Sequence, residues 1–172
     1  MTAENSRPQR LGRLETVFVD SPIYFVTACT ANRRQILTNS SIHEAFVEFG
    51  KNGPEYGAWL GKYVLMPDHV HAFVALDEDK IALANWMKSL KNSLSKALRA
   101  QNISAPHWQK AFFDHVLRSS ESYREKWEYV SENPVRAGFV KRSEDWPLQG
   151  PGVQESHAPN RRLIFQEHQC DG

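Results

Sequence analysis

Two apolar segments near the middle of the chain constrain its fold more than any other feature. Residues 59–66 (WLGKYVLM) and 69–76 (HVHAFVAL) are rich in β-branched and aromatic side chains, and only Pro67-Asp68 separates them. Such segments are typical of β-strands, and the short link indicates a tight hairpin or two neighbouring strands. The fold is therefore expected to be built on a β-sheet that contains this pair.

The segments on either side alternate between strand and helix patterns. Residues 23–30 (IYFVTACT) predict a strand, and apolar residues at helical spacing predict helices over about 40–51 and 81–100. Residues 107–118 can form a fourth strand, and a helix is expected over about 121–133, where a proline follows. This order suits an α+β, ferredoxin-like sandwich: a four-stranded antiparallel sheet with two packing helices, one sheet face left open, and an additional C-terminal helix.

The length of 172 residues fits one domain with a core of its own. We expect an irregular lead-in over residues 1–20, the folded domain over 21–148, and an extended or disordered tail over 149–172. No apolar run approaches the ~20 residues of a membrane span, and the polar N-terminus does not look like a secretion signal. A cytoplasmic protein without membrane contact is expected. The two cysteines show no metal-binding or disulfide spacing.

The charge of the chain is unevenly distributed. Its net charge is only +1, but residues 80–142 hold 12 Lys/Arg against 5 Asp/Glu, whereas the remainder holds 9 against 15. A basic segment of this kind can follow the phosphates of a nucleic acid. A solvated, lysine-rich helix face explains the same pattern equally well.

Two histidines on one expected strand are the first candidate functional residues. Residues two apart in a strand share a face, so His69 and His71 point the same way. The alternate residues are all apolar and form the better core face: Val70, Ala72, Val74 and Leu76. The histidines are therefore expected on the open face, where two imidazoles can share a divalent cation. Two unrelated surface histidines remain the alternative.

The second candidate is a tyrosine on the last expected helix. Tyr123, Trp127 and Val130 form an apolar stripe at i, i+4 and i+7, whereas Tyr129 and Asn133 share a different face one turn apart. If this helix crosses the open sheet face, it can present the phenol, and the amide of Asn133, to a metal at the histidines. The alternative is that Tyr129 covers an interface and Asn133 caps the helix end.

These residues together resemble a known family. Residues 65–71 (LMPDHVH) resemble the HUH motif of the single-tyrosine, IS200-like transposases, in which U is a bulky apolar residue. Residues 107–147 (HWQKAFFDHVLRSSESYREKWEYVSENPVRAGFVKRSEDWP) are similar to the C-terminal half of the REP-associated tyrosine transposases. The opening strand, residues 23–37 (IYFVTACTANRRQIL), fits their start. The resemblance covers about residues 20–148.

The resemblance implies a DNA transposase that cuts and rejoins single-stranded DNA through a 5′-phosphotyrosine. His69 and His71 match the metal ligands of the family, and Tyr129 matches its nucleophile. Asn133 stands where a further ligand is often found, although Pro134 beside it can draw it away. Mg²⁺ or Mn²⁺ suits such a donor set. The expected partner is hairpin DNA with a short single-stranded flank, bound by a monomer or a homodimer.

Several basic side chains are candidates for contacts with DNA phosphates: Arg33, Arg34, Lys88, Lys91, Lys96, Arg118 and Arg136. For each one, a solvated surface charge is the alternative. Trp108, Phe112 and Phe113 can stack on unpaired bases, although aromatic residues at strand spacing are more often core.

Two other functions remain open at the level of sequence. One is a ferredoxin-like module that binds single-stranded nucleic acid without cutting it. The other is a structural or regulatory metal-binding protein. Both predict that replacing Tyr129 by Phe leaves activity unchanged.

Overall fold

An antiparallel β-sheet is the centre of the computed structural model, which describes residues 22–117 and 120–152. Within these residues the sheet has five strands, in the order β4-β1-β3-β2-β5. Their bounds are β1 (Ile23–Cys29), β2 (Ala58–Met66), β3 (His69–Leu76), β4 (Phe113–Leu117) and β5 (Gln149–Gly150). The hairpin of β2 and β3 is the tight one, since only Pro67-Asp68 joins them.

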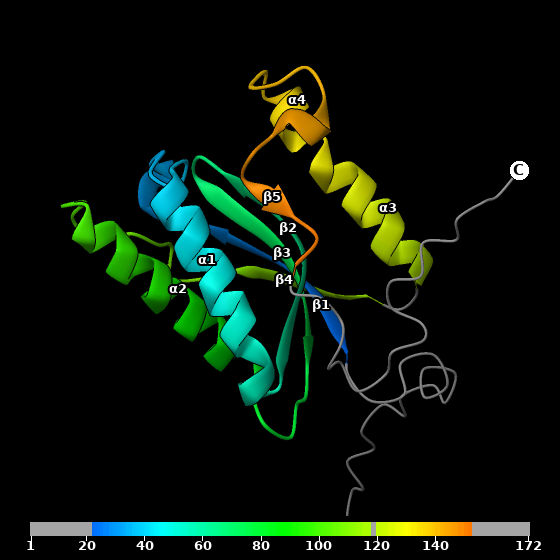
Figure 1. Ribbon diagram of the computed structural model, residues 1–172. Coiled ribbons are helices and arrows are strands. Elements are labelled where there is room, and N and C mark those ends of the chain that lie inside the picture. Colours follow the sequence, from blue (N-terminus) through cyan, green and yellow to red (C-terminus); the bar gives the residue numbers. More distant parts are fainter. Residues whose placement is uncertain (1–21, 118–119, 153–172) are drawn as a thin grey trace, which may run out of the picture.

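The helices lie in two layers (Figure 1). α1 (Ser40–Asn52) and α2 (Leu83–Ala100) lie side by side on one face of the sheet, and α3 (Ser120–Ser131) crosses the other face. A short α4 (Asn133–Arg136) follows α3. Three single-turn 3-10 helices complete the described part: η1 (Ala31–Arg33), η2 (Gly53–Tyr56) and η3 (Ser143–Asp145).

The main core lies between the sheet and the α1–α2 layer. The four apolar residues of β3 that were expected to form its core face are all buried there: Val70, Ala72, Val74 and Leu76. They pack against Ile42 and Phe46 of α1 and against the leucines that recur along α2. The side-chain alternation of β3 therefore places its odd-numbered residues on the opposite face.

The second face is partly covered by α3. Tyr123 and Val130 of this helix are buried against the sheet, and the Tyr123 ring lies 4.3 Å from the ring of Phe73. Trp127 packs beside them. The apolar stripe predicted for this helix is thus confirmed. The face that was expected to be open is covered over its middle by α3.

The sheet was expected to have four strands. This expectation is wrong, because the described residues form five. Gln149 and Gly150 add to the outer edge of β2, where they pair with Val64 and Tyr63. A strand of two residues carries no alternation that a sequence pattern could reveal. These residues belong to the segment that was expected to be a tail. Among the described residues no helix is both long and apolar enough to cross a membrane.

Two further boundaries differ from expectation. β4 begins at Phe113 rather than at residue 107, although Trp108 forms an isolated bridge with Thr30. The chain also continues helically beyond Pro134, because this proline lies in the first turn of α4. Backbone N–H groups in the first turn of a helix have no hydrogen-bond acceptor within that helix. A proline, which lacks this N–H, therefore costs no hydrogen bond there.

We expect Leu94→Ala to lower the free energy of unfolding by about 2–5 kcal/mol, because it removes a fully buried side chain from the main core. Lys88→Ala, on the exposed side of the same helix, should change it by less than about 0.5 kcal/mol. Urea denaturation monitored by circular dichroism measures both. Equal effects of the two substitutions would contradict the packing described here.

Candidate active site

His69 and His71 lie at the start of β3, on the face opposite α1 and α2. They pair in register with Cys29 and Thr27 of β1, and their rings are 4.7 Å apart and nearly perpendicular. The prediction that both histidines share the face opposite the core is confirmed. α3 leaves this end of the face accessible, since both side chains are only partly buried.

Each imidazole is held through its Nδ1 atom. His69 Nδ1 lies 2.6 Å from Asp68 Oδ1, and His71 Nδ1 lies 2.8 Å from Thr27 Oγ1. The other carboxylate oxygen of Asp68 forms an ion pair of 2.7 Å with Arg33 Nε. Such contacts fix the orientation of a ring and leave its second nitrogen available to a ligand. Within the described residues neither Nε2 has a hydrogen-bond partner.

Both histidines are held in the neutral form. Burial lowers the pKa of His71 to about 3, and the neighbouring His69, Arg33, Arg136 and Lys126 add to this effect. Burial also lowers the pKa of His69, against the opposing influence of Asp68. A neutral imidazole keeps the lone pair that a metal ion requires. Both imidazoles are therefore expected to be neutral at neutral pH, with one lone pair each left unprotonated.

The donor set is incomplete if only ionisable side chains are counted. The described part of the chain has no group of three His, Cys, Asp or Glu side chains able to hold a metal ion. For a metal at this pair, further donors from the described residues would be amide or backbone oxygens, with water or the substrate filling the remaining positions. The amide oxygen of Asn133 is the candidate from the sequence, and it accepts a hydrogen bond from the guanidinium of Arg136.

Tyr129 projects from α3 away from its apolar stripe, with 65% of the residue exposed. The guanidinium carbon of Arg136 lies 4.3 Å from the centre of its ring, and Arg136 also donates to the Tyr129 carbonyl at 2.7 Å. The expectation that Tyr129 is not a core residue is confirmed. Among the described residues no hydrogen bond or ring contact joins it directly to a histidine, but the charge of Arg136 acts on His71 as well.

Of the basic residues predicted to contact DNA, two lie at this site. Arg33 reaches it from η1 through Asp68, and Arg136 from α4 beside Tyr129. The sequence reasoning missed a third cation, Lys126, whose Nζ lies 5.4 Å from the Phe25 ring. Lys126 also acts electrostatically on His71. Lys126 lies three residues before Tyr129, and residues three apart on a helix share one side. This spacing could have identified Lys126 from the sequence.

Two other predicted residues have structural contacts. Arg34 donates to the backbone carbonyls of Ser104 and Pro106, and Lys91 donates to the carbonyls of Gln109 and Ala111. Both side chains therefore hold the segment between α2 and β4 in place. Contacts with DNA remain a prediction for them.

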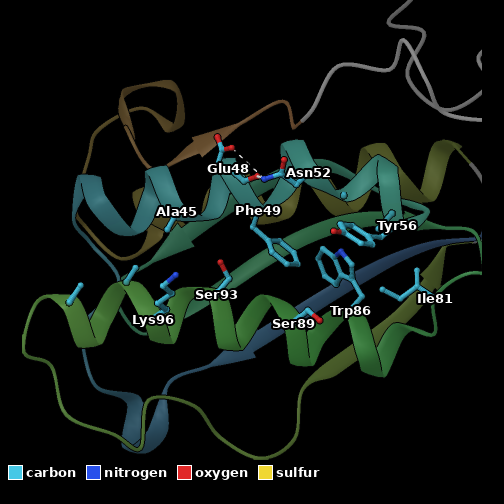
Figure 2. Close-up of a pocket in the computed structure, with 14 residues that line it drawn as sticks. Ala45, Glu48, Phe49, Asn52, Tyr56, Ile81, Trp86, Ser89, Ser93 and Lys96 are labelled. Carbon is cyan, nitrogen blue, oxygen red and sulfur yellow. Dashed lines mark hydrogen bonds between the residues drawn. The ribbon is translucent and has the colours of Figure 1, made fainter.

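Lys88 and Lys96 are exposed on α2, in the layer on the far side of the sheet from the histidines. Lys96 borders a groove of about 600 Å³ between α1 and α2, whose apolar lining includes Phe49 and Trp86 (Figure 2). This groove is separated from the histidines by the sheet and is not part of the candidate site. Arg118 lies outside the described residues.

The two side chains that hold the histidines were also missed. Asp68 directly precedes His69 in the sequence, so its contact with that imidazole could have been predicted from this adjacency. Thr27 is 44 residues from His71, and only the pairing of β1 with β3 brings them together.

Comparison with known proteins identifies the family. Residues 19–132 match the family model described as transposase IS200 like. The chain belongs to the IS200-like transposase family. Membership of this family implies an enzyme that cleaves and joins DNA, and it confirms the resemblance seen in the sequence.

Individual members of the family are similar over most of the chain. The chain is 30% identical over 135 residues to the REP-associated tyrosine transposase of Escherichia coli (strain K12), covering 76% of this chain and 77% of that protein. It is also similar in fold to a solved structure of a REP-associated tyrosine transposase bound to a REP hairpin. That likeness has a TM-score of 0.59 and 23% identity, and covers 84% of this chain and 81% of the other.

We expect the imidazole of His71 to stay neutral well below its ordinary pKa of 6.5 in metal-free protein. The unfolded chain then binds a proton that the folded chain does not bind. The free energy of unfolding should therefore fall as the pH is lowered from about 6.5 towards 3. Nitrogen-15 NMR of the imidazoles measures the pKa, and the spectrum of His71→Gln assigns the signal. A titration near 6.5 would contradict the described environment.

Proposed function

We propose that this chain cleaves and rejoins single-stranded DNA, with Tyr129 as the nucleophile and a divalent cation held by His69 and His71. The observation that carries the proposal is the pair of neutral imidazoles, each fixed through Nδ1, with both Nε2 atoms left available. Neither Nε2 atom has a hydrogen-bond partner among the described residues, so both remain available to a ligand. The exposed phenol beside a guanidinium supplies the second half of the site.

The residues present fit a hard or borderline divalent cation. His69 and His71 would each give one nitrogen, and Asn133 would give an amide oxygen, which leaves positions for the substrate. Nitrogen donors favour Mn²⁺ slightly, whereas Mg²⁺ is the more abundant ion in cells. The bound cation would stabilise the negative charge that develops on the non-bridging oxygens of the scissile phosphate.

Tyr129 would act by transesterification. Its phenolic oxygen forms a bond to phosphorus while the bond from phosphorus to the 3′-oxygen breaks, and the phenolic proton is lost as the 3′-oxygen gains one. The products are a 5′-phosphotyrosine and a free 3′-hydroxyl. A different 3′-hydroxyl can then attack the phosphotyrosine and release Tyr129. One phosphoester bond replaces another in each step, so strand joining needs no nucleotide cofactor.

Arg136 would connect the nucleophile to the phosphate. In the free protein its guanidinium lies over the Tyr129 ring and donates to the amide oxygen of Asn133. A phosphate in the site is a stronger acceptor for a guanidinium than an amide oxygen is. Turning Arg136 to the phosphate would release the amide oxygen of Asn133, which could then act as a ligand to a bound cation. Lys126 adds a further positive charge on the same side.

The substrate that fits best is hairpin DNA with an unpaired flank. One similar structure is of a REP-associated tyrosine transposase bound to a REP hairpin. The site of the present chain lies on an accessible sheet face with three cations around it. A single strand can reach such a surface, whereas the phosphates of an intact duplex are held at fixed separation.

The deciding test of this proposal is a covalent adduct. Labelled hairpin DNA with a single-stranded flank, incubated with the protein and Mn²⁺, should give a protein–DNA band on a denaturing gel. Tyr129→Phe should abolish this band. Tyr56→Phe is the matched control, since Tyr56 is equally exposed, at 65%, but lies in the other layer. If the wild-type protein binds the DNA but yields no adduct on any hairpin, the non-catalytic binding module replaces this proposal.

A second test addresses the metal. Asp68→Asn removes the carboxylate charge that holds His69 and pairs with Arg33, so it should weaken Mn²⁺ binding by about 10- to 100-fold. Asp77→Asn is the control, because Asp77 forms an ion pair with Lys80 at the other end of β3. Calorimetric titration with Mn²⁺ measures both variants. Equal affinities for the two would exclude the proposed role of Asp68.

A further inference from the structure

Phe113 is an aromatic side chain that the fold leaves uncovered next to the histidines. Of the described phenylalanines it is the most exposed, at 58%. It is the first residue of β4 and pairs in register with Thr27, which in turn pairs with His71. Residues opposite each other in neighbouring strands point to the same face. Phe113, Thr27 and His71 therefore form one row across three strands.

An aromatic contact extends this row. The Phe113 ring lies 6.5 Å from the ring of Phe25, edge to face, and Phe25 stacks on the His71 ring at 5.4 Å. α3 packs through Tyr123 on Phe73, nearer the centre of the sheet, and leaves Phe113 uncovered on the edge strand. The exposed Phe113 ring thus stands in line with His71 at the solvent edge of the sheet, supported by the buried ring of Phe25.

We propose that Phe113 is a stacking platform for one unpaired DNA base, the base adjacent to the scissile phosphate. This inference rests on the proposed function and adds a specific subsite to it. Every base has an aromatic face that can stack on a phenyl ring without reading its sequence. Phe113 stands on the edge strand β4, two strands away from His71 and roughly 10 Å across the sheet. A base joined to a phosphate at His71 can span this separation.

The charges around Phe113 favour a nucleic acid as the occupant. Lys126 of α3 lies over the Phe25 ring, which is also the ring that Phe113 contacts. The charges of Lys126 and Arg136 both act on His71. An apolar ring bordered by cations complements a base joined to phosphates. A second copy of this chain would have to bring its own cations close to these.

The experiment measures stacking directly and does not depend on cleavage. Hairpin DNA carries 2-aminopurine at one unpaired position at a time, and Tyr129→Phe protein binds it without cutting. We expect quenching of the fluorescence at one position of the flank. Adding Phe113→Leu should remove this quenching and weaken binding by about 5- to 100-fold, whereas Phe113→Tyr should keep both.

Val116→Ala is the matched control. Val116 is also exposed on β4, at 41%, but its side chain points to the opposite face of the sheet. It should therefore leave quenching and affinity unchanged. Circular dichroism of each variant shows that the fold is kept.

The outcomes separate the two proposals. If wild-type protein forms the tyrosine adduct but Phe113→Leu leaves quenching and affinity unchanged, the platform is wrong and the proposed function stands. If quenching depends on Phe113 but no adduct forms, the platform is supported and the chain is a binding module. If Phe113→Leu instead converts a dimer to a monomer in sedimentation without DNA and leaves quenching unchanged, Phe113 serves an interface and the platform is overturned.

Discussion

The candidate site depends on the pairing of β1 with β3. The two-residue period of β3 sends its apolar residues into the main core and His69 and His71 to the other face. The same pairing brings Thr27 beside His71 and fixes its ring. A slip of one residue in this register would turn every side chain of β3 to the opposite face, so the core itself protects the geometry of the histidines.

Burial then decides the chemistry of these histidines. Removing an imidazole from water disfavours its charged form, and three cations nearby disfavour it further. The site thus holds neutral nitrogen donors inside a positive field. Under the proposed function, this field would attract a phosphodiester while the two imidazoles stay neutral.

The sequence predicts much of this fold because apolar spacing alone defines the long elements. The alternation in β3 and the leucine spacing of α2 were sufficient to place their faces correctly. The failures have a common physical origin: β5, Thr27 and the carbonyl contacts of Arg34 and Lys91 arise between segments distant in sequence. No local pattern encodes such contacts. The roles of Tyr129 and Asn133 came from family resemblance and remain a proposal.

An irregularity in β2 contributes to the orientation of α3, the helix that carries Tyr129. The pairing of β2 with β3 shifts register between Leu60 and Tyr63, and a side chain at Gly61 would press against the hydroxyl of Tyr123 at 3.1 Å. The absence of a side chain there lets Tyr123 approach closely enough for its hydroxyl to accept a hydrogen bond from the Lys62 N–H at 3.2 Å. Tyr123 and Tyr129 lie on one helix, so this contact, together with the burial of Val130, orients α3 about its axis. This packing leaves the phenol of Tyr129 exposed to solvent, as the proposed nucleophile requires.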